Sequence, residues 1–486
     1  MKRNVPSLSK SIITKLMENR TANCIAIKEN KIWNWKSKQQ LLNGISNARD
    51  FLQEYNIDRG DRVAYKGDNS INWVAWNIAT NSLGAVWVPM YTNQPEKYTS
   101  YVIEDCNPKL FISTQPDLEV NKSINISNSL DFTKEMTDFH FKCNELSTLI
   151  YTSGTTGNPK GVMLSNNNIL TNIESVERRF HNVGKTTSLN ILPWAHIYSQ
   201  TCELYYNLLN DNPFGIATNK DKFIEECKEF KPQVLYLVPR VLEVIKDKVA
   251  FLDKPIIKIV LPLVLKHLFG NNLKYIFTGG AKLNHDVKDF YEKNKIIICE
   301  GYGCTETAPM ISVNHYNTPR NINSIGKILD NVIVEIINDE IHVAGENVMM
   351  GYWNDAEKTK DVIIEKNGIR FYKTGDSGEI KDGYLYYKNR ISTNYKLSNG
   401  KFVDVETTES LIKKHICGPF IIFGENLKNN RLICTTDVSL ENVNKELDNH
   451  MKIDKIYKLD LDVFSTFYTP KLSIKRKEII KHVLNI

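Results

Sequence analysis

The sequence predicts an α/β fold, in which a large N-terminal domain of doubly wound α/β subdomains leads into a β-subdomain and then a small C-terminal domain. Up to about residue 310, short apolar runs alternate with helical patterns, as in parallel sheets covered by helices. From Ser324 onward, closely spaced strand pairs around turn residues predict hairpins instead. With 486 residues, the chain is too long for one compact core, so we expect two or three domains.

The first third of the chain already has this α/β alternation. Apolar residues predict strands over 62–65 and 85–89, and a helical pattern over 73–83 lies between them. The polar residues 121–129 predict a surface loop before the next strand begins.

The next strand leads into a loop that is suited to phosphate. An apolar run over 146–152 predicts the strand, and Lys160 in the following loop can supply a counter-charge. Glycines let backbone N–H groups approach an anion, and hydroxyl side chains add donors. The loop contains the glycines Gly154, Gly157 and Gly161 and the hydroxyl residues Ser153, Thr155 and Thr156. A Walker loop is excluded because it needs Gly-Lys-Ser/Thr, whereas Lys160 stands between Pro159 and Gly161. An ordinary turn after a strand is the plain alternative.

After this loop the chain repeats one pattern four times, with an apolar run that ends in a loop marked by Gly or Pro. In a parallel sheet, such loops emerge at the same carboxyl edge, where ligands bind in open α/β folds. We therefore expect the four loops to share one site. The runs are residues 189–192, 234–238, 275–277 and 296–299, and the loops begin at Pro193, Pro239, Thr278 and Glu300.

The last third of the chain changes character. Residues 332–337 and 341–343 predict one hairpin, and residues 378–380 and 384–387 predict another. Residues 390–400 are the expected junction with the small last domain. Its basic tail, residues 471–481, is most simply a solvated face.

Composition excludes several classes of protein. The net charge of +6 rests on 62 basic and 56 acidic residues, a balance that argues against nucleic-acid binding but suits anionic small molecules. Nine cysteines without a Cys-x-x-Cys pair predict reduced thiols in a cytosolic compartment, with neither disulfides nor zinc. Residues 1–10 have no apolar run behind their basic residues, so we expect no secretory signal.

Two motifs downstream of the predicted phosphate loop resemble those of a known family. Residues 301–307, Gly-Tyr-Gly-Cys-Thr-Glu-Thr, are similar to the Tyr-Gly-x-Thr-Glu motif of the adenylate-forming superfamily. Residues 372–376, Tyr-Lys-Thr-Gly-Asp, are similar to its Thr-Gly-Asp motif. This superfamily contains acyl-CoA synthetases, luciferases and peptide-synthetase adenylation domains. A lone Thr-Glu pair would more often be a helix cap, but this pair follows a strand in the right order after the phosphate loop.

The resemblance implies roles for single residues. Tyr302 would pack on adenine, Thr305 would contact the α-phosphate, and Glu306 would hold Mg2+ as a hard oxygen ligand. Asp376 would accept hydrogen bonds from the ribose hydroxyls, and Arg390 would contact ribose and phosphate. The residues implied to bind ATP or AMP are Thr152, Ser153, Gly154, Thr155, Thr156, Gly157, Gly279, Gly280, Ala281, Glu300, Gly301, Tyr302, Gly303, Thr305, Asp376 and Arg390. The residues implied to be catalytic are Lys160, His196, Thr305, Glu306 and Lys471.

Within the superfamily, the chain resembles the long-chain acyl-CoA synthetases. The segments at 192–196, 396–401 and 468–476 are similar to their versions, and His196 would lie at the mouth of the acyl and pantetheine tunnels, unless it is a satisfied loop histidine. Two positions depart from the pattern. Thr393 replaces an aspartate in the hinge motif, and Ser473 occupies the slot of the catalytic lysine, which makes Lys471 the favoured substitute and Lys475 the other candidate.

The resemblance implies ATP and coenzyme A as co-substrates, Mg2+ as the metal and a fatty acid as the acyl donor. Residues 1–390 would bind AMP and the acyl group, and residues 391–486 would form a mobile α+β domain. We therefore expect an AMP-forming long-chain fatty acid CoA ligase. Two alternatives stay open: a weakened homologue that only binds nucleotide or acyl ligands, and an adenylating enzyme that loads another acceptor, such as a carrier protein, or oxidises the adenylate as luciferases do.

The strongest apolar segment, residues 255–269, bears on membrane contact. Lys258 and Lys266 interrupt it before it reaches the length needed to cross a bilayer. It is either a buried helix or a surface that lines an acyl channel or touches a membrane. We expect a cytoplasmic protein, with peripheral membrane contact left open.

Overall fold

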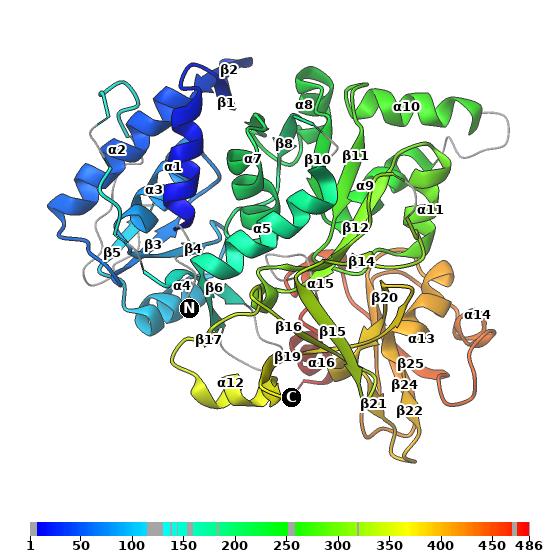
Figure 1. Ribbon diagram of the computed structural model, residues 1–486. Coiled ribbons are helices and arrows are strands. Elements are labelled where there is room, and N and C mark those ends of the chain that lie inside the picture. Colours follow the sequence, from blue (N-terminus) through cyan, green and yellow to red (C-terminus); the bar gives the residue numbers. More distant parts are fainter. Residues whose placement is uncertain are drawn as a thin grey trace.

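The computed structural model describes residues 7–113, 130–136, 139–142, 144–152, 159–181, 184–250, 258–317, 320–468 and 474–485. Two large sheets with helices around them make up most of the molecule, and a smaller lobe lies at the lower right of Figure 1. The α/β prediction is confirmed by this arrangement of strands and helices.

The first large sheet has six strands in the order β17-β7-β6-β4-β3-β5. Its strands are β3 (Arg62–Lys66), β4 (Val86–Met90), β5 (Leu110–Ser113), β6 (Leu146–Thr152), β7 (Lys160–Ser165) and β17 (Gly351–Tyr352). The helices of this part of the chain are α1 (Leu8–Glu18), α2 (Lys38–Glu54), α3 (Ile71–Ser82), α4 (Glu96–Cys106) and α5 (Asn166–Phe180). Strands β3 to β6 are parallel to one another, so they end at one carboxyl edge.

Local signals in the sequence set the helix starts of this region. Ser37 and Gln40 form a reciprocal capping box at the start of α2, and Ser165 and Asn168 form another at the start of α5. Because Ser165 is also the last residue of β7, the chain passes from strand to helix without a loop.

The second large sheet has fourteen strands and joins a parallel half to an antiparallel half. Its strands are β1 (Asn23–Glu29), β2 (Ile32–Ser37), β8 (Ser188–Asn190), β9 (Phe214–Ile216), β10 (Val234–Leu237), β11 (Tyr275–Thr278), β12 (Ile298–Gly303), β13 (Met310–Val313), β14 (Lys327–Ile328), β15 (Val332–Ile337), β16 (Glu340–Gly345), β18 (Ile363–Lys366), β19 (Ile369–Lys381) and β20 (Tyr384–Arg390). The four strands predicted to share one edge, β8, β10, β11 and β12, are parallel neighbours. The predicted hairpins correspond to β15–β16 and β19–β20.

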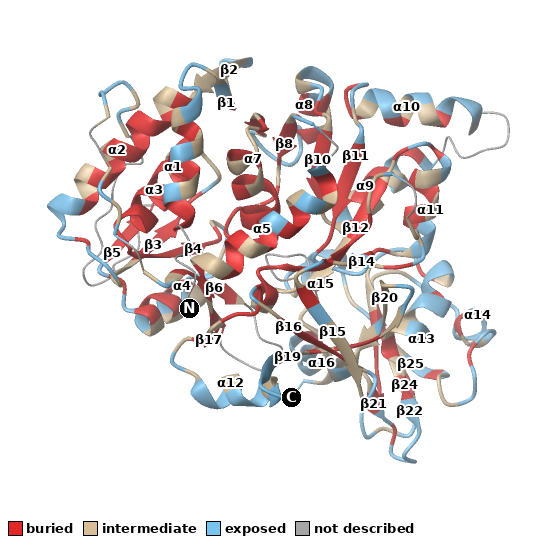
Figure 2. Ribbon diagram, viewed as in Figure 1, coloured by how far each residue is buried: buried red, intermediate tan, exposed pale blue. Residues whose placement is uncertain are grey.

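Helices cover the parallel half, and most residues of its strands are buried (Figure 2). The helical elements of this region are α6 (Ile197–Ser199), the π-helix η2 (Gln200–Tyr205), α7 (Tyr206–Leu209), α8 (Phe223–Phe230), α9 (Pro239–Val249), the 3-10 turn η4 (Lys258–Val260), α10 (Leu261–Leu268), α11 (His285–Lys293), the 3-10 turn η5 (Thr305–Thr307) and α12 (Ala356–Val362). Trp73 contacts both Trp87 and Trp194 in the core, with ring centroids 5.2 and 5.5 Å apart, respectively. These rings bind the first sheet to the loop that follows β8, which fixes the two sheets relative to each other.

The lobe at the lower right of Figure 1 has its own core. Its elements are β21 (Tyr395–Lys396), β22 (Phe402–Val403), α13 (Val405–Ile412), the 3-10 turn η7 (Lys413–His415), β23 (Phe420–Phe423), β24 (Asn430–Cys434), α14 (Leu440–Asn444), β25 (Ile453–Lys458), α15 (Leu461–Ser465) and α16 (Arg476–Leu484). We call residues 395–485 the C-terminal lobe and residues 7–390 the large lobe; the 3-10 turn η6 (Ile391–Thr393) connects them.

The apolar segment at 255–269 becomes α10 in its second half, while residues 251–257 lie outside the described part of the chain. Leu261 and Leu265 of α10 are buried, whereas Ile259 and Leu263 are exposed, so the segment is partly core and partly surface. Among the described residues, no helix is both long and apolar enough to cross a membrane.

Candidate active site

The two ends of the predicted phosphate loop lie side by side. Strands β6 and β7 are antiparallel and pair Thr152 with Lys160. The loop residues Ser153, Gly154, Thr155, Thr156 and Gly157 lie outside the described residues. The Lys160 ammonium lies 5.0 Å from the centroid of the Tyr352 ring, a cation–π distance that ties β7 to β17.

Strand β12 carries the glycine-rich motif up to the edge of the sheet. At Gly303, an added Cβ would lie 1.8 Å from the Pro309 carbonyl oxygen, so only glycine fits this close approach. The motif then enters η5, where Thr305 is buried and Glu306 is half-buried. The tight packing fixes the path of the backbone between Tyr302 and Glu306.

Tyr302, Asp376 and Arg390 form one hydrogen-bonded group. The Tyr302 hydroxyl donates to Asp376 Oδ2 at 2.7 Å, and Arg390 Nη1 donates to Asp376 Oδ1 at 2.8 Å. Strands β19 and β20 pair Asp376 directly with Arg390, and β20 is joined through β14 and β13 to β12, which carries Tyr302. Burial raises the pKa of the Asp376 carboxyl, and the nearby Arg390 charge and the Tyr302 hydroxyl partly offset that rise.

Glu306 has a partner that the sequence alone did not indicate. The Tyr352 hydroxyl donates to Glu306 Oε1 at 2.8 Å, and the Met349 N–H donates to the Glu306 carbonyl at 2.8 Å. Tyr352 thus contacts both Glu306 and Lys160. Its ring and hydroxyl bring the two predicted catalytic charges to the same place.

The residues present fit a magnesium ion bound together with a nucleotide. Mg2+ in such sites is held by one or two carboxylates and by phosphate oxygens of the substrate, so one carboxylate is sufficient on the protein side. Among the described residues, Glu306 Oε2 accepts no hydrogen bond from the protein. No group of three or more His, Cys, Asp or Glu side chains in the described ranges could hold a metal without such a substrate.

The segment 279–281 follows β11 and lies beside β12. An added Cβ at Gly279 would come within 3.2 Å of the Gly301 carbonyl oxygen, and Gly280 has a φ of +81°, which favours glycine. Ala281 is exposed. Gly280 and Ala281 therefore lie at the surface, whereas Gly279 is buried.

The side chain of Glu300 points into the core and forms an ion pair there. Its carboxylate accepts from the buried Lys288 ammonium at 2.7 Å, and the residue is 6% exposed. Its side chain is thus occupied within the core, and any contact with a nucleotide would come from the backbone.

His196 is half-buried at the start of α6, and its Nδ1 accepts from the Tyr198 N–H at 3.2 Å. The π-helix η2 that follows was not predicted. It places Glu203 in the core, fully buried, where Oε2 accepts from Asn190 Nδ2 at 2.7 Å. Oε1 has no hydrogen-bond partner among the described residues. Burial raises the pKa of Glu203 to about 8.

The sequence did not indicate that Glu203 is buried, because a glutamate in an otherwise apolar helix can equally be the one residue that faces solvent. Sequence reasoning also missed Tyr198, whose ring lies 3.8 Å from the position of a Cβ added at Gly279 and whose buried hydroxyl has no partner in the described part of the chain. Of these two side chains, Tyr198 lies next to the segment predicted to lie along adenine. The one available signal was the run of polar residues from Ser199 to Glu203 between apolar neighbours.

The predicted substitutes for the missing lysine are only partly placed. Lys471 and Ser473 lie outside the described residues. Lys475 is described: its ammonium lies 5.3 Å from the Tyr98 ring centroid and 3.3 Å from Glu478 Oε2. Thr393 donates its hydroxyl to the Arg390 carbonyl at 2.8 Å.

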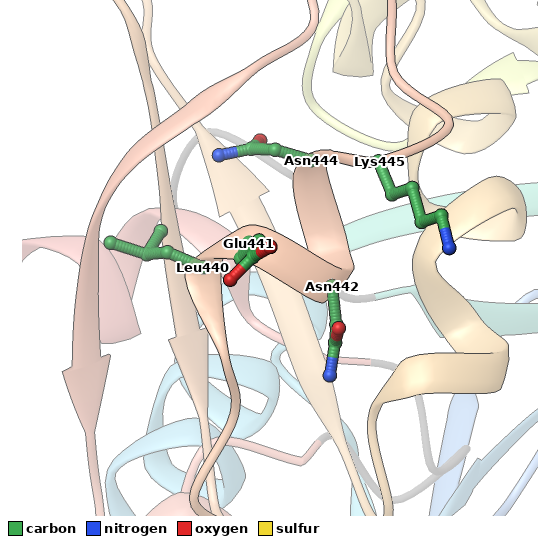
Figure 3. Close-up of a pocket in the computed structure, with 5 residues that line it drawn as sticks. All are labelled: Leu440, Glu441, Asn442, Asn444 and Lys445. Atoms are coloured by element: carbon green, nitrogen blue, oxygen red, sulfur yellow. The ribbon is translucent and has the colours of Figure 1, made fainter.

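A surface depression of ≈ 380 Å³ lies elsewhere, on α14 of the C-terminal lobe (Figure 3). It is lined by Leu440, Glu441, Asn442, Asn444 and Lys445. None of the predicted site residues lines it, and it has no role in the arrangement above.

Comparisons with known proteins show which proteins this chain is similar to. Residues 17–353 match the AMP-binding enzyme family. Long chain acyl-CoA synthetase 3 of Arabidopsis thaliana is 23% identical, over 85% of this chain and 75% of that protein. A long-chain-fatty-acid–CoA ligase of Mycobacterium bovis is 23% identical, over 79% of this chain and 74% of that protein. The structure of O-succinylbenzoate coenzyme A synthetase from Bacillus subtilis, in complex with AMP, is similar with a TM-score of 0.80 at 18% identity, and the match covers 96% of this chain and 97% of that one.

Proposed function

The chain belongs to the family of AMP-binding enzymes, and from that premise we propose that it activates a fatty acid for transfer to coenzyme A. The carboxylate attacks the α-phosphate of ATP, which gives an acyl-adenylate and releases pyrophosphate. The thiolate of coenzyme A then attacks the acyl carbon, which gives acyl-CoA and releases AMP.

One observation carries the proposal: the motif at 302–306, at the end of β12, contributes one residue to each of two hydrogen-bonded groups that would serve one nucleotide. Asp376 is held by Tyr302 and Arg390, and Glu306 is held by Tyr352, which also contacts Lys160. Ribose hydroxyls can replace the Tyr302 hydroxyl as donors to Asp376, so the carboxylate would keep its hydrogen bonds.

The charges of the second group suit the phosphates. Lys160 and Thr305 would stabilise the negative charge that develops as pyrophosphate leaves, together with the loop at 153–157. Bound Mg2+ would supply further charge neutralisation on the phosphate oxygens. Glu306 would hold that ion, and Tyr352 keeps the Glu306 carboxylate oriented.

The choice of a fatty acid rests on the names of the two curated relatives. The Bacillus subtilis protein of similar structure is named as a synthetase for O-succinylbenzoate, so the fold itself is compatible with other acids. We also propose that the boundary between the two domains lies at 390/391. We further propose that the protein is cytoplasmic and that the exposed side of α10 contacts a membrane surface.

A second candidate is a weakened homologue that binds nucleotide or acyl ligands. It is favoured by Ser473, since a neutral hydroxyl cannot make the charge contact that the family's lysine makes with the acyl carboxylate and the α-phosphate. Lys471, and after it Lys475, would substitute under the main proposal. Alanine at either position should slow adenylation if that residue substitutes, while Ser473→Lys should have little effect.

The function is tested by incubating the purified protein with ATP, Mg2+, coenzyme A and acids from acetate to oleate. We expect release of AMP and pyrophosphate only with medium or long fatty acids. Absence of product with every acid would contradict the enzyme proposal, and tight ATP binding in the same sample would then favour the second candidate.

A further inference from the structure

The two lobes of the protein touch through polar and charged side chains rather than through a shared core. Among the described residues, the hydrophobic clusters of the C-terminal lobe contain only residues from 395 onward, and those of the large lobe contain only residues before 386. Interfaces of this kind within one chain allow the lobes to move relative to each other. Single polar contacts can therefore decide the orientation of the C-terminal lobe.

One carboxylate of the C-terminal lobe makes three of these contacts. Glu406, in the first turn of α13, accepts at Oε1 from the Tyr387 hydroxyl at 2.8 Å and from the Arg390 N–H at 3.2 Å. At Oε2 it accepts from the Lys282 ammonium at 3.2 Å. All three donors belong to the large lobe, and together they use both carboxylate oxygens.

Each of these donors is tied to the candidate nucleotide site. Arg390 holds Asp376 through its guanidinium while its backbone N–H holds Glu406. Lys282 directly follows the segment 279–281, and its ammonium also lies 5.5 Å from the Tyr387 ring centroid. Glu406 thus binds the parts of the large lobe that the nucleotide would contact.

Among the described residues, the other hydrogen bonds, ion pairs and ring contacts between the lobes are single contacts. Asn389 donates to Asp404 at 2.7 Å, Lys413 lies 3.4 Å from Glu243, and the Lys475 ammonium lies 5.3 Å from the Tyr98 ring centroid. None of these pairs includes a residue predicted to bind the nucleotide.

We propose that Glu406 is a positioning residue that fastens the C-terminal lobe to the nucleotide side of the large lobe and must release its three donors when that lobe changes orientation between the two half-reactions. The two half-reactions named in this inference rest on the proposed function, whereas the contact itself does not. The three bonds break together because they share one carboxylate, so the contact is a two-state element.

The chain provides a matched control on the same helix. Glu409 is 17% exposed, against 21% for Glu406, and also accepts both an N–H and a cationic side chain. Its partners, Ile422 and Arg476, lie within the C-terminal lobe. Glu409→Gln should therefore disturb that lobe without loosening it from the large lobe.

The orientation is measured between spin labels on the exposed Cys417 and on Lys185→Cys, in a Cys143→Ser background. Glu406→Gln should change the ratio of the two populated distances about tenfold relative to the parent, since it removes the charge from all three bonds. Lys282→Met should shift the ratio in the same direction by less, and Glu409→Gln should leave it unchanged. An unchanged distribution in Glu406→Gln would overturn the inference.

The half-reactions give a second readout in the unlabelled protein. Adenylation is followed by pyrophosphate exchange, and thioester formation by supplying acyl-adenylate and coenzyme A. Glu406→Gln should change the ratio of the two rates about tenfold, whereas Glu409→Gln should lower both rates equally or not at all. A parallel loss of both rates in Glu406→Gln would mean a purely structural role. If the parent protein catalyses neither step, the proposed function fails, while the distance measurement still decides the inference.

Discussion

Two buried carboxylates, Asp376 in the proposed nucleotide site and Glu203 on the π-helix η2, have opposite electrostatic surroundings. Asp376 is 6% exposed, and each of its oxygens accepts a hydrogen bond, one of them from a guanidinium. Glu203 is fully buried, with one amide donor and one oxygen that has no partner among the described residues.

The difference distinguishes the proposed ligand site from the core around Glu203. Arg390 offsets much of the cost of burying Asp376, and its Tyr302 bond can be exchanged for a ligand hydroxyl. No cation pairs with Glu203 among the described residues, so burial dominates and favours the protonated form. The proposed nucleotide site keeps its charges available, whereas burial around Glu203 suppresses the charge of that carboxylate.

The largest expected effect is the pH dependence of stability that Glu203 introduces. Its pKa is raised from 4.5 to about 8 in the folded protein. Below pH 4.5, Glu203 is protonated in both the folded and the unfolded protein. Between pH 4.5 and about 8, it is protonated only in the folded protein. Stability is therefore lost as the pH rises, by about 4–5 kcal/mol in the free energy of unfolding by pH 8.

Glu203→Gln should remove this loss, because glutamine has no proton to release. The measurement is the free energy of unfolding in denaturant at pH values from 5 to 9 for both proteins. Equal pH slopes for the parent and the variant would mean that Glu203 is ionised in the folded state, and the contrast with Asp376 would disappear.

The next effect concerns Asp376. Asp376→Ala should weaken nucleotide binding by about 1.5–3 kcal/mol, the scale for hydrogen bonds to a charged group. Titration calorimetry with AMP measures this directly. Asp361→Ala, at an exposed position on α12, is the control and should bind as the parent does. An unchanged affinity in Asp376→Ala would refute the ribose role.

The smallest effect separates the hydroxyl of Tyr352 from its ring. Tyr352→Phe removes the bond to Glu306 but keeps the ring against Lys160. Half-saturation should need a few times more Mg2+, since one neutral bond is worth about 0.5–1.5 kcal/mol. Glu306→Gln should raise the Mg2+ requirement further, because it removes the charged ligand itself. If the two variants have the same Mg2+ dependence as the parent, Glu306 does not hold the ion.

The sequence predicted those parts of the molecule that local pattern determines. The apolar run at 146–152 is strand β6 with the same limits, and the four strands expected to share an edge are parallel neighbours. Residues such as Tyr302 and Asp376 were chosen through motifs, and the strands bring them within hydrogen-bonding distance.

The sequence could not indicate partners that only the tertiary fold creates. Tyr352 lies 46 residues from Glu306 and belongs to a two-residue strand without a recognisable motif. Glu406 resembles any acidic residue in the first turn of a helix, where the helix dipole alone would favour it. The π-helix at 200–205 has no periodic signal distinct from that of an α-helix, so the burial of Glu203 could not be foreseen.

The account depends most on formation of an acyl-adenylate at the nucleotide side. The direct measurement is a single turnover with ATP, Mg2+ and a long fatty acid in the absence of coenzyme A, with products identified by mass spectrometry. The account predicts an enzyme-bound acyl-adenylate that disappears when coenzyme A is added, as acyl-CoA and AMP appear in equal amounts. Bound ATP that stays intact with every fatty acid supplied would contradict it.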